Sequence, residues 1–98
     1  MLTLKRILFT LEKFCGKGNV VLSRSKGSPL TVVYCGGHKV MYLVKSYCGG
    51  WVCLLNFKVS SYDIEPFLIK GDMKEFVYFL MYIDSLSNGY LSGFRRVA

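Results

Sequence analysis

The chain has 98 residues, of which 52% are hydrophobic and 15% aromatic, and its formal net charge is +7. This length suits one domain with a buried core, and so apolar a composition excludes intrinsic disorder as the default state. The longest apolar run, residues 76–83, is far shorter than the roughly 18–20 residues of a membrane span. No signal-peptide pattern follows Lys5 and Arg6, so we expect a cytoplasmic protein that does not bind membranes, with its four cysteines reduced.

The positive charge is concentrated in the first two thirds of the chain. Residues 1–61 hold nine Lys and Arg against one Glu, a net +8, whereas residues 62–98 hold four against five acidic residues, a net −1. A concentrated positive field attracts polyanions or acidic protein surfaces. Net charge also keeps a small hydrophobic protein in solution, so both explanations stay open.

Residues 2–15 are predicted to form an amphipathic helix. Apolar side chains recur at helical spacing at Leu4, Ile7, Leu8, Leu11 and Phe14. Thr3 is a suitable N-cap, and Gly16 or Gly18 would end the helix. The apolar stripe favours packing on a core. A basic helix on a membrane surface is the alternative, which the short length and Glu12 disfavour.

A short strand at residues 20–22 and a Ser/Gly-rich basic loop at residues 23–29 come next. The strand is expected to pair with residues 30–35. Three cations in this region are available for phosphates: Lys17, Arg24 and Lys26. The segment around Lys17 lacks the glycine spacing and the Lys-Ser/Thr ending of a P-loop, so nucleotide hydrolysis is not expected. Contact with a nucleic-acid backbone and a merely solvated loop remain as alternatives.

The tetrapeptide Tyr-Cys-Gly-Gly occurs twice, at residues 34–37 and 47–50, and predicts two hairpin turns. A Gly-Gly pair adopts φ > 0 at both positions without steric cost, as a two-residue hairpin turn requires. The flanking segments are rich in β-branched and aromatic residues. Residues 30–60 are therefore predicted to form a three-stranded antiparallel meander, which the strand at 20–22 extends to four strands.

Two-residue turns fix the expected register. Cys35 would pair with His38, Val33 with Val40, and Cys48 with Trp51. Directly paired residues share a face of the sheet. On this register the central strand would bury Val40, Tyr42, Val44 and Ser46. The same register would leave Met41 and Leu43 on the opposite, half-exposed face.

The half-exposed face is the candidate nucleic-acid surface. It would combine three lysines with two tyrosines: Lys39, Lys45, Lys58, Tyr34 and Tyr47. Proteins that bind single strands use such basic and aromatic residues on an open sheet. Apolar residues on the same face, such as Val52 and Leu54, indicate that part of it is covered.

The C-terminal third is predicted to contain a connector at 60–66, a short strand or buried plug at 67–69, and a helix from about Asp72 to Leu86. Asp72 and Glu75 resemble a capping box. Four apolar side chains, Phe76, Phe79, Leu80 and Ile83, can cover the sheet. Four others, Val77, Tyr78, Met81 and Tyr82, either pack on the first helix or form an interface with a partner or a second copy. Residues 90–98 are expected to be a mobile tail.

Neither metal chemistry nor catalysis is expected. The zinc-type ligands would lie at opposite ends of the central strand, since His38 and Cys48 are ten residues or roughly 33 Å apart. Cys35 opposite His38 is the only nucleophile–base pair, and no third group orients the imidazole. The six acidic residues suit solvation and helix capping. We therefore expect no cofactor and no enzymatic activity.

The sequence predicts an α+β fold: an N-terminal helix, a three- to four-stranded antiparallel meander, and a C-terminal helix packed on the sheet. The leading functional hypothesis is a basic module that binds nucleic acid or a nucleoprotein complex stoichiometrically. The alternative rests on size, the missing catalytic set and the apolar C-terminal helix. These features are similar to those of small phage or viral proteins that bind and block a host defence protein. The alternative includes binding as a homodimer.

Overall fold

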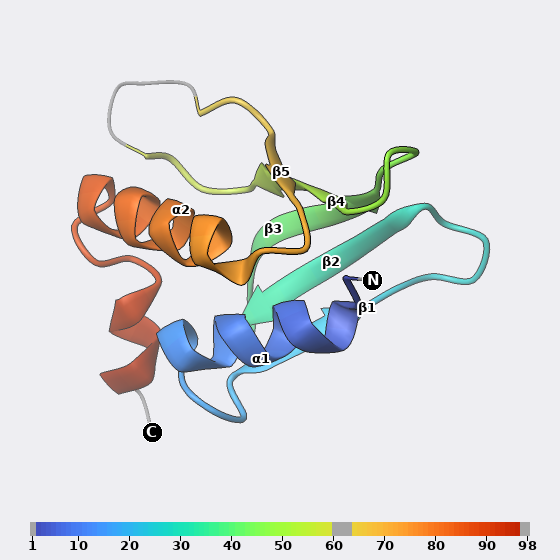
Figure 1. Ribbon diagram of the computed structural model, residues 1–98. Helices are drawn as coiled ribbons and strands as arrows, with labels where there is room; N and C mark the ends of the chain where they lie inside the picture. The colour runs from blue at the N-terminus through green and yellow to red at the C-terminus, as the bar shows by residue number, and fades with distance from the viewer. Residues whose placement is uncertain (1, 60–63, 97–98) are drawn as a thin grey trace.

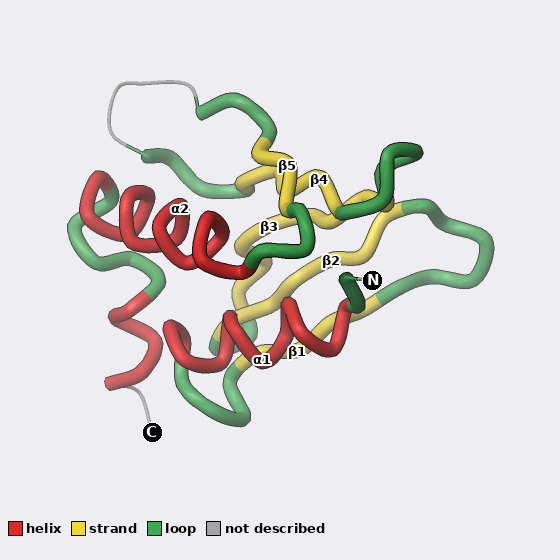
Figure 2. The backbone as a smooth tube through the Cα atoms, in the orientation of Figure 1, coloured by secondary structure: helices red, strands yellow, loops and turns green. Residues whose placement is uncertain are grey.

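The computed structural model describes residues 2–59 and 64–96. Its elements are α1 (Leu4–Cys15), β1 (Val20–Ser23), β2 (Leu30–Cys35), β3 (His38–Lys45), β4 (Trp51–Leu55), β5 (Phe67–Ile69), α2 (Met73–Leu86) and the 3₁₀ helix η1 (Ser92–Arg96). The five strands form one antiparallel sheet in sequence order. Both helices lie on the same side of it (Figures 1 and 2). The expected α+β fold is confirmed, with one strand more than expected because residues 67–69 join the sheet.

Helix α1 begins and ends where the sequence indicates. The Thr3 hydroxyl accepts a hydrogen bond from the Arg6 N–H at 3.4 Å, which caps the helix. Gly16, at φ 93°, ends it, and the Gly16 N–H donates to the Glu12 carbonyl. Ile7 and Leu11 are fully buried against the sheet, so the amphipathic prediction is confirmed.

The first hairpin also forms as expected. Gly36 and Gly37 have φ values of 57° and 82°, and Cys35 pairs with His38 across the turn. β1 pairs with β2 and places Val20 opposite Cys35. The fourth strand predicted at residues 20–22 is thus confirmed.

The predicted register is wrong beyond Lys39, because β3 contains a bulge. Tyr34 pairs with Lys39 but Val33 pairs with Met41, so Val40 is an extra residue on β3. One extra residue moves every following side chain of the strand to the other face.

The second turn also differs from the prediction. Lys45, rather than Cys48, pairs with Trp51, so residues 46–50 form a five-residue loop. The Ser46 N–H donates to the Gly50 carbonyl at 3.0 Å and closes this loop.

The bulge and the longer loop together decide which face of the central strand is buried. Met41 and Leu43 lie under the helices with 0% exposure, and Tyr42 and Val44 point to the other side. Sheet side chains then pack with Ile7 and Leu11 of α1 and with Phe76 and Leu80 of α2 in one core. Phe67 of β5 stacks on Phe79 of α2, with ring centroids 4.2 Å apart.

The side of the sheet away from the helices is apolar, and we call it the open sheet face. It consists of Val21, Leu30, Val32, Tyr34, Tyr42, Val44, Val52, Leu54 and Leu68. None of these nine side chains belongs to the buried core or packs against it. An antiparallel sheet with one covered face commonly carries polar residues on the other. Here both faces are apolar.

The C-terminal segment, for which the sequence predicted a mobile tail, packs onto the domain. Leu91 is fully buried, and the Phe94 ring lies 5.8 Å from the His38 ring and 5.2 Å from the Tyr90 ring. Residues 97 and 98 of the expected tail, and residues 60–63 of the expected connector, lie outside the described residues. Within the described part of the chain, no helix combines the length and the hydropathy needed to cross a membrane.

Candidate nucleic-acid interface

The predicted nucleic-acid residues lie at two opposite ends of the sheet. Lys17, Tyr34 and Lys39 lie near the end where α1 finishes and the Gly36-Gly37 turn forms (Figure 1). Arg24, Lys26, Lys45 and Tyr47 belong to the other end, in or beside the β1–β2 and β3–β4 loops. Lys58 is exposed and follows β4. The eight residues therefore do not form one surface.

The expected surface of alternating lysines and tyrosines is not present. Lys39 pairs with Tyr34 at the end of the open sheet face, as the first turn predicts. Lys45 pairs with Trp51 and so lies on the helix-covered side, where it lines a hollow beside Leu2. The reason is the one-residue bulge at Val40 together with the five-residue loop that follows β3.

A different basic surface runs along the outer face of α1. Lys5, Phe9 and Lys13 are spaced four residues apart and therefore lie in one row on the helix, with Arg6 beside them. The Phe9 ring is 61% exposed, and the Lys13 Nζ lies 4.7 Å from its centroid. A solvated phenyl ring in contact with an ammonium group is a cation–π pair.

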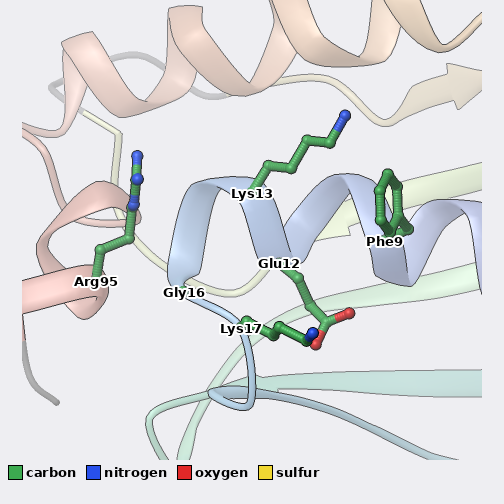
Figure 3. A pocket seen from close by; sticks show the side chains of 6 residues that line it. All are labelled: Phe9, Glu12, Lys13, Gly16, Lys17 and Arg95. Atoms are coloured by element: carbon green, nitrogen blue, oxygen red, sulfur yellow. The ribbon is translucent and has the colours of Figure 1, made fainter.

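Two further cations extend this surface, which we call the α1 basic stripe: Lys5, Arg6, Phe9, Lys13, Lys17 and Arg95. A hollow of about 320 Å³ is lined by Phe9, Lys13, Lys17 and Arg95, together with Glu12 and Gly16 (Figure 3). A second, of about 520 Å³, continues along the helix past Lys5 and Arg6 and shares Phe9 and Lys13 with the first. Lys13 and Arg95 extend to one side of α1, and Glu12 and Lys17 extend to the other (Figure 3).

Arg95 reaches the stripe because a hydrogen-bonded link holds η1 against the end of α1. The side-chain amide of Asn19 donates to the carbonyls of Cys15 and Phe94, both at 2.9 Å. The single carboxylate of the stripe, Glu12, accepts a hydrogen bond from the Gly18 N–H at 3.3 Å and so helps to fix the turn that carries Lys17. Five cations, one carboxylate and one exposed aromatic ring therefore lie along α1 and its C-terminal end.

Sequence reasoning included Lys17 in the site but missed Lys5, Arg6, Phe9, Lys13 and Arg95. The signal for four of these was present, because Lys5, Phe9 and Lys13 share the helical face opposite to Ile7 and Leu11. The sequence offered no signal for Arg95, because its placement depends on contacts between segments far apart in the chain.

The predicted partner interface on α2 is largely accessible. Tyr78, Met81 and Tyr82 are 68%, 53% and 57% exposed, and they lie on the side of the helix away from the core residues. Val77 is half-buried and lines a hollow between the helices with Thr10 and Phe14 of α1.

The thiol and imidazole groups beside the first turn differ in their exposure. His38 is exposed and packs on Phe94, whereas Cys35, its partner across the turn, is buried with Cys15. The pKa of Cys15 is raised, because its thiol hydrogen-bonds to Cys35 and because burial disfavours the thiolate. Among residues 2–59 and 64–96, no three His, Cys, Asp or Glu side chains converge as metal ligands would.

Comparison with protein-family models, curated proteins and solved structures finds no match to this chain. The function therefore has to be argued from the surfaces of the molecule. The α1 basic stripe is suited to hold phosphate groups and to stack one aromatic ring.

Proposed function

We propose that this protein binds nucleic acid stoichiometrically, without catalysis, through the α1 basic stripe. The observation that carries the proposal is a row of cations along the outer face and the end of α1, with Lys13 in contact with the exposed ring of Phe9. Lysine and arginine neutralise phosphates and release counterions, and an accessible aromatic ring stacks on an unpaired base. Either a free strand or the nucleic-acid part of a nucleoprotein complex presents these groups.

The dimensions of the stripe favour a short single-stranded segment. Lys5 and Lys13 are eight residues apart on α1, which corresponds to a rise of about 12 Å. This length spans at most about three to four nucleotides, at the roughly 3.4 Å rise of a fully stacked strand. Phe9 lies midway between the two lysines, and only unpaired bases expose a face on which it can stack.

The test measures the affinity of fluorescently labelled single- and double-stranded oligonucleotides by anisotropy at several salt concentrations. Lys5→Gln/Arg6→Gln/Lys13→Gln should weaken binding to the single strand at least about tenfold, because it removes about three phosphate contacts. It should also make the slope of log K against log salt shallower by roughly 2, at about 0.7 per contact. Phe9→Ala should weaken single-strand binding by about 5- to 100-fold and leave duplex binding nearly unchanged.

A matched control removes the same charge at the other end of the sheet. Arg24→Gln/Lys26→Gln/Lys45→Gln leaves the α1 basic stripe intact and should keep most of the affinity. Equal losses in both triple variants would show that only the net charge matters. A loss confined to the control variant would move the site to the two loops, and either result would refute the stripe.

The exposed side of α2 favours a second candidate function, an inhibitor that binds and blocks a host protein. Tyr78, Met81 and Tyr82 are large, accessible and adjacent on one helix, and aromatic residues and Met are enriched in protein interfaces. Such binding would hardly depend on salt and would be lost in Tyr78→Ser/Met81→Ser/Tyr82→Ser. Salt-insensitive binding to a protein target, with no measurable affinity for oligonucleotides, would favour this candidate over the first.

A further inference from the structure

The open sheet face is an apolar surface whose half-buried side chains lie outside the core formed by the described part of the chain. Its centre consists of Val32 and Tyr34 on β2, Tyr42 and Val44 on β3, and Val52 and Leu54 on β4. Both helices pack on the opposite face, and the six side chains make no contribution to the core. The largest apolar patch on a typical monomer measures about 300–600 Å² and is often functional.

We infer that this face is where two copies of the chain associate, sheet against sheet. Two antiparallel sheets pack face to face at about 10 Å, with their strands within about 30° of each other and side chains interdigitating. A two-fold axis between the sheets lets each face meet its own copy, as a closed dimer requires. The inference does not depend on the proposed nucleic-acid binding, since it concerns the other side of the molecule.

The area agrees with a dimer of modest strength. Five strands spaced by about 4.8 Å and about five residues long give a flat footprint of roughly 24 by 17 Å, or about 400 Å². Side chains make the real surface larger than this flat footprint, and residues at its edge add to it. Two copies would together bury on the order of 1,000 Å² of accessible surface, at the lower end of specific interfaces. Interfaces of this size are mostly weak or transient, and we expect a dissociation constant of about 1–100 µM.

The charge distribution favours a second copy over an acidic partner. None of the nine side chains of the open sheet face is charged, and Lys39 lies at its end beside Tyr34. A surface that selects an acidic protein would carry several cations, and the α1 basic stripe lies on the other side of the sheet. Sheet-to-sheet packing places the two α1 basic stripes on opposite outer sides, roughly 30 Å apart by layer thickness, which is several Debye lengths at physiological salt. Repulsion between the two α1 basic stripes thus does not oppose this arrangement.

Sedimentation equilibrium of the full chain from about 1 to 200 µM tests the inference. The mass should rise from that of one chain towards twice that value, and 0.5 M NaCl should not weaken the association. Val44→Thr/Val52→Thr/Leu54→Thr keeps β-branched residues in the strands and removes apolar surface, so it should weaken the dimer at least tenfold. The control Tyr78→Ser/Met81→Ser/Tyr82→Ser removes the other exposed apolar group, on α2, and should leave the dissociation constant unchanged.

Two outcomes would overturn the inference. One is a wild-type mass that stays at one chain up to 200 µM, a measurement that needs no variant to fold. The other is a dimer that the α2 variant abolishes and the sheet variant keeps. Circular dichroism of each variant establishes that the sheet is retained before its mass is interpreted.

Discussion

At the scale of single residues, Thr31 has an unusual environment. It lies on the covered face of β2 with 2% exposure, and its Oγ1 is the single buried side-chain oxygen or nitrogen without a hydrogen-bond partner among the described residues. An unpaired hydroxyl in an apolar core costs about 1–3 kcal/mol of desolvation. Valine has nearly the same shape and no hydroxyl.

We therefore expect Thr31→Val to raise the free energy of unfolding by about 1 kcal/mol in urea denaturation. Thr10→Val is the matched comparison, because the Thr10 hydroxyl donates to the Arg6 carbonyl at 3.0 Å. Loss of this hydrogen-bonded hydroxyl should leave the free energy of unfolding unchanged or slightly lower. A Thr31→Val protein less stable than wild type would contradict the account of an unpaired hydroxyl.

Cys53 gives a pH-dependent prediction. Burial raises the pKa of its thiol from 9.0 to about 12. The thiol is then neutral in the folded protein at pH values where it ionises in the unfolded chain, so its contribution to stability is full below pH 9 and is lost as pH rises towards 12. Between pH 8 and pH 10 this group alone should lower the free energy of unfolding by about 1.4 kcal/mol.

Urea denaturation of wild type and Cys53→Ala at both pH values checks this effect. Other groups titrate equally in both proteins, so the difference between them isolates Cys53. The same loss of stability in the two proteins would show that its thiol does not titrate as described.

At the scale of elements, the β3–β4 loop packs closely against the edge strand β5 at one glycine. Gly49 and Gly50 both have positive φ, 75° and 115°. A Cβ on Gly50 would lie 2.5 Å from the Ile69 carbonyl oxygen of β5, whereas a Cβ on Gly49 would meet nothing within 4 Å. An alanine would therefore cause backbone strain at both positions and a clash only at Gly50.

Gly49→Ala should therefore destabilise the protein by about 1 kcal/mol, from backbone strain alone. Gly50→Ala should cost roughly 3 kcal/mol or more, since β5 must also move away from β4. Thermal denaturation of the two variants measures both values. Equal losses would show that β5 does not pack against this loop.

The same elements show how far the sequence alone could lead. Caps, periodicity and Gly-Gly turns predicted α1, α2, β1 and the first hairpin, since these features are local. The bulge at Val40 and the length of the loop at 46–50 depend on which side chains fit under the helices, and they reversed the assignment of Met41 and Leu43. The predicted surface of lysines and tyrosines is wrong for that reason. The helical spacing of Lys5, Phe9 and Lys13 is present in the sequence, although the prediction did not use it.

At the scale of the whole molecule, the charged and the apolar surfaces are on opposite sides. Both helices pack on one face of the sheet, and the open sheet face lies on the other side (Figure 1). The stripe residues of α1 lie on the helical face opposite to the buried Ile7 and Leu11. We expect the affinity for a trinucleotide to be the same in wild type and in the Val44→Thr/Val52→Thr/Leu54→Thr variant. A 40-nucleotide strand should bind wild type at least about tenfold more tightly than the variant, because both stripes of a dimer engage one strand. Anisotropy titrations with both lengths measure this, and equal affinities for the long strand would contradict it.

Having both helices on one side of the sheet has a further effect. Each copy can bind a nucleic acid at the α1 basic stripe and a second copy at the open sheet face at the same time, because the two surfaces do not overlap. Two separate strands held by one pair of chains would then be brought within a few nanometres of each other, so that the protein would act as a cross-bridge.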